Sequence, residues 1–97
     1  MSGFTSNPWI KSGGNYGKEI SLSADGTFRA SYGQNLIVNC TADSELNPSG
    51  SFTTGFSVSI FNIGTNTILF DGSHSIEPGQ RAVFAYDKTN DEFVGGV

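Results

Sequence analysis

Cysteine and histidine are almost absent from this sequence. Cys40 is the single cysteine and His74 the single histidine among 97 residues. One cysteine excludes an internal disulfide and a Cys-x-x-Cys metal motif, and one residue of each kind falls short of the ligands that zinc requires. Cys40 stands in the apolar run Leu-Ile-Val-Asn-Cys-Thr, so we interpret it as a small hydrophobe of the core. We interpret His74 as an exposed turn residue.

Charge is also scarce. Only 14% of the residues are charged, against about 25% in an average domain. The net charge is −4. The basic residues are scattered rather than clustered: Lys11, Lys18, Arg29, Arg81 and Lys88. This distribution argues against nucleic acid and anionic membrane as partners, because both require clustered Lys and Arg.

Long apolar runs are missing as well. No window approaches the roughly 20 apolar residues of a membrane-spanning helix. The first residues lack the basic start and the apolar run of a secretory signal, so no such signal is expected. The length predicts one domain with a modest core.

Helical periodicity is absent, and alternating apolar and polar residues take its place. The abundance of Gly, Ser, Thr, Asn and Phe also favours strands over helices. We therefore predict an all-β protein, a small antiparallel β-sandwich or jelly-roll-like barrel of seven or eight strands. The expected strands cover 19–24, 26–32, 35–41, 56–61, 67–70, 81–87 and 90–96. The segments 24–26, 42–51, 71–76 and 77–80 are expected to be turns or loops, the first of them a hairpin turn.

The first 17 residues differ from the rest. They have little regular pattern, yet they carry large apolar side chains that a disordered tail usually lacks. We predict an extended N-terminal arm over residues 1–17 and a single β domain over residues 18–97. The candidate partner-binding residues of the arm are Phe4, Pro8, Trp9, Ile10 and Tyr16. The alternative is that Trp9 and Ile10 fold back over the core of the domain.

The order of strand and turn motifs in the last two thirds of the chain matches a known pattern. The motifs are Gly55–Gly64, Asn66–Ile68, Asp71–Gly72, Ile76–Gln80 and Val83–Asp87. This series resembles the β-rich virion modules of tailed bacteriophages, which occur in tail fibres, adhesins and head decoration (cement) proteins. The resemblance covers Leu36 to Gly96, although residues 91–94 stand where that family often has Gly-x-Trp. It implies a non-enzymatic virion protein that is homotrimeric.

Residues with reactive chemistry are few. His74 lies near Asp71 and Glu77 in the sequence, but a triad requires a nucleophile and a carboxylate brought together in space. Two acidic loops, one with Asp43 and Glu45 and one with Asp87, Asp91 and Glu92, lack the residue order of a calcium loop. Paired carboxylates that cut a glycosidic bond are a further alternative. We expect no enzyme, no catalytic or metal site and no cofactor.

Besides the aromatic residues of the arm, the sequence has aromatic residues in the expected strands. Five phenylalanines fall in or beside expected strands and are expected in the core: Phe28, Phe56, Phe61, Phe70 and Phe84. Tyr32 and Tyr86 are the alternative candidates for stacking against a sugar.

The resemblance and the length together suggest a specific function. A compact body with a gripping arm suits a capsid decoration protein that stabilises the head shell, with the arm contacting the major capsid protein. The expected location is therefore the virion surface. The alternative is a receptor-binding module of a tail fibre or baseplate that recognises host surface glycan.

Overall fold

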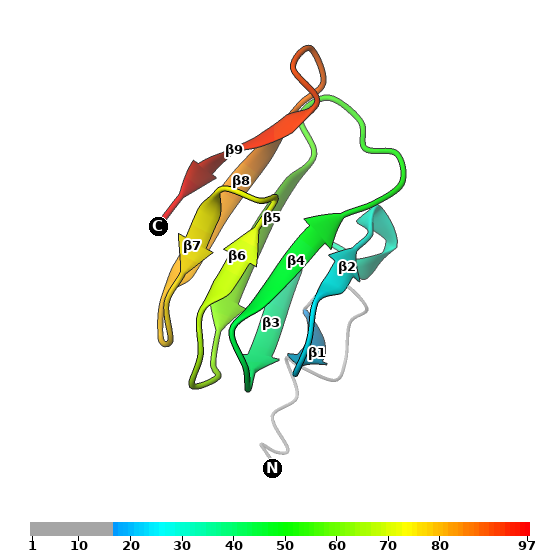
Figure 1. Cartoon of the computed structure of the whole chain (residues 1–97). Helices are drawn as coiled ribbons and strands as arrows, with labels where there is room; N and C mark the ends of the chain where they lie inside the picture. Colours follow the sequence, from blue (N-terminus) through cyan, green and yellow to red (C-terminus); the bar gives the residue numbers. More distant parts are fainter. Residues whose placement is uncertain (1–16) are drawn as a thin grey trace.

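The computed structural model describes residues 17–97, and this part of the chain is built almost entirely of β-strands. Two sheets form two layers, with β2, β4, β6 and β7 in one and β1, β3, β5, β8 and β9 in the other (Figure 1). The elements in chain order are β1 (Lys18–Leu22), β2 (Gly26–Phe28), the short 3-10 helix η1 (Ala30–Tyr32), β3 (Asn35–Cys40), β4 (Ser44–Pro48), β5 (Ser57–Asn62), β6 (Ile68–Phe70), β7 (His74–Ile76), β8 (Arg81–Asp87) and β9 (Glu92–Gly96).

From β1 to β6 the chain alternates between the two sheets. Each return to the same sheet runs in the same direction, so β1, β3 and β5 are parallel neighbours, and so are β2, β4 and β6. The direction then reverses: β7 pairs antiparallel with β6, β8 with β5, and β9 with β8. Both sheets are therefore mixed, and the prediction of an antiparallel architecture is wrong for the first half of the fold. Parallel neighbours need a crossover, and here the crossover is a strand of the opposite sheet.

Alternation along the strands sends one set of side chains into a single core. In β5, Val58 and Ile60 are buried, whereas Ser57, Ser59 and Phe61 point to the outer face. The expected core position of Phe61 is therefore wrong, because it shares the parity of the two serines. The buried hydrophobic residues are Leu22, Phe28, Leu36, Val38, Cys40, Leu46, Phe52, Val58, Ile60, Ile68, Phe70, Ile76, Ala82, Phe84 and Phe93. The prediction that Cys40 belongs to the core is confirmed.

Several local expectations are corrected. The segment 26–32 is not one strand, because β2 ends at Phe28 and η1 follows it. The turn 24–26 is not a hairpin turn, since it connects strands of different sheets. The expected loop 42–51 contains β4, and the expected turn 71–76 contains β7. Within residues 17–97 no helix has the length and apolar character needed to cross a membrane.

A buried amide and a glycine stabilise the end of β5. The Asn62 side chain is fully buried; its Nδ2 donates to the carbonyl oxygens of Asn66, at 2.7 Å, and Ile76, at 3.0 Å. Its Oδ1 accepts a hydrogen bond from the backbone N–H of Gly64 at 2.9 Å. All of its strong hydrogen-bonding groups thus have partners, as a buried polar group requires.

Candidate functional site

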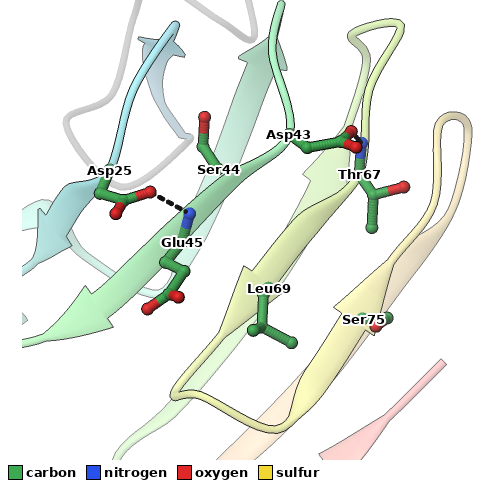
Figure 2. A pocket seen from close by; sticks show the side chains of 7 residues that line it. All are labelled: Asp25, Asp43, Ser44, Glu45, Thr67, Leu69 and Ser75. Carbon is green, nitrogen blue, oxygen red and sulfur yellow. Dashed lines mark hydrogen bonds between the residues drawn. The ribbon is translucent and has the colours of Figure 1, made fainter.

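A shallow hollow lies on the outer face of the four-stranded sheet (Figure 2). Its volume is about 350 Å³ and it is open to solvent. The side chains come from β4, β6 and β7 and from the turns that precede β2, β4 and β6. The lining residues are Asp25, Asp43, Ser44, Glu45, Thr67, Leu69 and Ser75.

Two carboxylates of the hollow brace the backbone around it. Asp25 Oδ1 accepts a hydrogen bond from the backbone N–H of Glu45 at 2.9 Å. Asp43 Oδ1 accepts one from the backbone N–H of Thr67 at 3.0 Å and one from the Asn66 amide at 3.3 Å. Asp25 therefore ties the turn before β2 to β4, and Asp43 ties the turn before β4 to the turn before β6, each through one carboxylate oxygen.

The chemistry of the hollow is that of a hydrogen-bond acceptor. Glu45 lies in β4 rather than in a loop, and Figure 2 shows its carboxylate projecting from the strand. Within residues 17–97 no group of three or more His, Cys, Asp or Glu side chains is arranged to hold a metal ion. The hollow offers carboxylate and hydroxyl oxygens to a ligand, but it contains no histidine or cysteine that would serve as base or nucleophile.

His74 is a structural residue of β7. It is half-buried, its Nε2 lies 2.9 Å from the carbonyl oxygen of Phe93, and its ring packs on Phe84 at 4.9 Å between centroids. The interpretation of an exposed turn histidine is corrected, because the side chain links β7 to β9. Its sequence neighbour Asp71 accepts a hydrogen bond from the backbone N–H of Phe93 at 2.9 Å instead of contacting His74.

The acidic segment between β8 and β9 forms a self-bonded turn. Asp87 Oδ2 accepts a hydrogen bond from the Asn90 amide at 2.8 Å, and this bond lowers the pKa of Asp87 below its usual 3.8. The Tyr86 hydroxyl donates to Asp91 Oδ1 at 2.6 Å, and this bond raises the pKa of Tyr86 above 10.0. These carboxylates thus have protein partners.

The two tyrosines predicted for sugar stacking are both half-buried. Tyr86 packs against Phe52 and Phe93, with ring centroids 5.5 Å and 5.3 Å away. Tyr32 meets Phe28 edge-on at 5.9 Å, and the Lys18 ammonium lies 5.3 Å from its ring centroid. Neither tyrosine is among the residues that line the hollow.

The five predicted partner-binding residues of the N-terminal arm lie outside the described residues. They are Phe4, Pro8, Trp9, Ile10 and Tyr16.

Sequence reasoning missed a second surface, the outer face of the five-stranded sheet. Val83 and Val94 are 54% and 45% exposed there. The register places Val83 beside Ser59 of β5, and Ala85 beside Val94. The alternation of β5 and β8 was the available signal, because outward positions with Val, Ala and Phe are uncommon on a solvated sheet.

Comparisons with known proteins do not assign this chain to a family. No family model matches the chain, and no curated protein matches it. A chain in a solved structure of a chaperone–substrate complex is similar over 86% of this chain, at 14% identity and a TM-score of 0.45. This chain spans only 14% of that chain. Neither fold nor function is inferred from a likeness at this level.

Proposed function

We infer that this protein is a capsid decoration protein of a tailed bacteriophage, which binds the head shell through its N-terminal arm. The observation that carries the proposal is the distribution of apolar side chains. Among residues 17–97, the buried core cluster already has members from each of the nine strands. The proposal is that the large apolar side chains of residues 1–17 bind a foreign surface rather than this core.

The β domain and the N-terminal arm have different roles in this proposal. The body, a small sandwich of two sheets, supplies a rigid base, and the arm supplies aromatic anchors of the type that dominates interface energies. Burial of such side chains contributes about 25 cal/mol per Å² before ordering costs. Many copies on a repeating lattice would add avidity to a weak single contact. The homotrimer implied by the resemblance stays a prediction.

Deletion of residues 1–10 tests this proposal. The truncated body is expected to keep the circular dichroism spectrum and cooperative unfolding of the full chain, but to lose binding to purified capsids in co-sedimentation. The matched variant Trp9→Ala with Ile10→Ala keeps the chain length and is expected to bind at least about tenfold more weakly. A truncated protein that still saturates the heads contradicts the proposal.

Glycan recognition is the second candidate, and the hollow on the four-stranded sheet favours it. Its carboxylate and hydroxyl groups, from Asp25, Asp43, Glu45, Thr67 and Ser75, are of the kind that hydrogen-bond sugar hydroxyls. A glycan-array signal that is lost in Glu45→Gln, together with a dozen or so copies per particle, would favour a tail module. Hundreds of copies and no glycan signal would favour decoration.

A further inference from the structure

Residues 18–70 form three coils that stack in parallel. Each coil is one strand of the five-stranded sheet followed by one strand of the four-stranded sheet: β1 with β2, β3 with β4, and β5 with β6. All neighbouring strands in this stack are parallel. Figure 1 shows β1 and β2 on one side of the molecule and β7 and β9 on the other. The two sheets therefore have their free edges at two opposite ends.

The end at β7 and β9 is closed. Both backbone hydrogen-bonding groups of Phe93 in β9 have side-chain partners: its N–H donates to Asp71 Oδ2 at 2.9 Å, and its carbonyl oxygen lies 2.9 Å from His74 Nε2. Farther along β9, Gly95 and Gly96 have φ of 141° and 149°, far from the φ of about −140° in an antiparallel strand. A further strand therefore finds no regular row of backbone groups along the described part of β9.

The edge of β1 is open. The carbonyl oxygen of Leu22 accepts a hydrogen bond from the N–H of Thr41, which follows β3, at 2.8 Å. Because successive residues of a strand direct their backbone groups to opposite sides, Ile20 also faces β3, whereas Glu19 and Ser21 face away from it. Among residues 17–97, no strand pairs with β1 on that side. Two N–H groups and two carbonyl oxygens thus form a regular row.

The edge of β2 repeats this arrangement in the other sheet. The carbonyl oxygen of Phe28 accepts a hydrogen bond from the N–H of Ser49 at 2.8 Å, so Thr27 faces away from β4. A lysine often protects an open edge, but the Lys18 ammonium lies over the ring of Tyr32, 5.3 Å from its centroid. Such an edge is a template for a further strand.

The core is incompletely covered at the same end. Three of the five partly buried hydrophobic residues that pack against the core lie here: Ile20 in β1, and Ala30 and Tyr32 in η1. Ile20 shares the inner face of β1 with the buried Leu22, whereas Glu19 is exposed on the outer face. A strand beside β1 would therefore cover Ile20 with an apolar side chain and pair Glu19 with a basic one.

We propose that the β1 edge binds an extended segment of another protein, which adds a strand to the five-stranded sheet. Hydrogen bonds to the backbone of Glu19 and Ser21 supply affinity, and the alternating side chains supply selectivity. The segment runs parallel to β1, because a parallel chain can then cross to the β2 edge along the path that the three coils take. One short strand buries far less than the roughly 800 Å² of a standard interface, so a free peptide binds weakly.

Hydrogen exchange of the free full-length protein, measured by NMR, tests whether the edge is open. The amides of Glu19 and Ser21 are expected to exchange at least about tenfold faster than those of Ile20 and Leu22, which face β3. Equal protection of all four amides overturns the proposal. Protection at every concentration would mean that residues 1–16 occupy the edge, and protection only at high concentration would mean that a second copy does.

A synthetic peptide tests binding. The probe is acetyl-Ser-Val-Arg-Val-Thr-Val-Ser-amide, which sets valines on the inner face and arginine beside Glu19. At millimolar concentration it is expected to slow exchange at Glu19 and Ser21 at least about fivefold. The same peptide with N-methylated valines keeps the side chains but lacks the donors that face β1 in parallel pairing. It is expected to bind at least about tenfold more weakly, and equal binding contradicts the proposal.

Substitutions in β1 test the site. Ser21→Pro removes the outward N–H and places its ring on the open side, while the ladder with β3 is kept, so peptide binding is expected to be lost. Ser21→Ala is the matched control and is expected to bind as the wild-type protein does. Glu19→Lys is expected to weaken binding about threefold, and a peptide with Glu in place of Arg is expected to restore it.

Two results with the variants would overturn the proposal. One is a Ser21→Pro protein that has the wild-type circular dichroism spectrum and still binds the peptide. The other is a set of peptide-induced chemical-shift changes centred on Val83 and Val94 instead of on β1 and β2. The proposal does not rest on capsid binding, and a failure of that function leaves it intact.

Discussion

Gly64 packs directly against the backbone of Cys40. A Cβ atom built on Gly64 would overlap the N, C and O atoms of Cys40, which belong to β3 and cannot move aside as a flexible side chain could. The carbonyl oxygen of Cys40 also accepts hydrogen bonds from the backbone N–H groups of Thr65 and Asn66, at 2.9 Å and 3.1 Å. The turn after β5 therefore lies close to the end of β3.

Gly64→Ala is accordingly expected to destabilise the protein. The added methyl group must push the turn away from β3, and overpacking of this kind costs about 2 kcal/mol in the free energy of unfolding. Urea denaturation followed by circular dichroism measures the loss.

Gly50→Ala is the control, since a Cβ atom there meets nothing within 4 Å but the backbone has φ of 93°. It is expected to cost about 1 kcal/mol from backbone strain alone. Equal losses in the two variants would mean that the contact with Cys40 contributes nothing.

The strands with clear alternation were predictable from the sequence. Asn35–Cys40 and Arg81–Asp87 have apolar residues at every second position, and the predicted and observed bounds agree to within one residue. Ser44–Pro48 was missed because Leu46 is its only large apolar residue and it ends in Asn-Pro, which is typical of a loop. His74–Ile76 was missed because three residues are too short for a period to be detected.

Pairing was not predictable in the same way. Alternation tells which side chains point inward, but it does not tell which strand lies next to which. The hollow depends on pairing, because parallel register between β4 and β6 brings Glu45 beside Leu69. The alignment of Glu19 in β1 with Arg81 in β8 on the outer face of the five-stranded sheet depends on it too, through three separate strand pairs. Local sequence patterns therefore identified which side chains are buried. The two outer surfaces arise from pairing between strands that are distant in the sequence.

Asn62→Ala is expected to cost more than a surface substitution. The change leaves the carbonyl oxygens of Asn66 and Ile76 and the N–H of Gly64 without the side-chain partners that they now have. The loss of such buried hydrogen bonds is expected to lower the free energy of unfolding by about 3 kcal/mol.

Asn39→Ala is the matched control for Asn62, because Asn39 is half-buried on the outer face of β3. It is expected to change stability by no more than about 0.5 kcal/mol. Thermal unfolding of the two variants in parallel checks the difference. If both melt at the same temperature, the buried amide does not hold the end of β5.

The free energy of unfolding is expected to depend on pH through Asp87. Its pKa is lowered from 3.8, first by the hydrogen bond from the Asn90 side chain and then by the backbone N–H groups of Asn90 and Thr89. Because the folded pKa lies below the unfolded one, the stabilisation is fully present above about pH 4 and is lost as the pH falls through the folded pKa.

Asn90→Ala is expected to shift the Asp87 pKa upward toward 3.8 and to flatten the acid limb of the stability curve. An NMR titration of the Asp87 carboxyl carbon measures the shift, with Thr89→Ala as the control that keeps both backbone donors. A wild-type Asp87 that titrates at or above 3.8 would show that the turn between β8 and β9 does not form these bonds in solution.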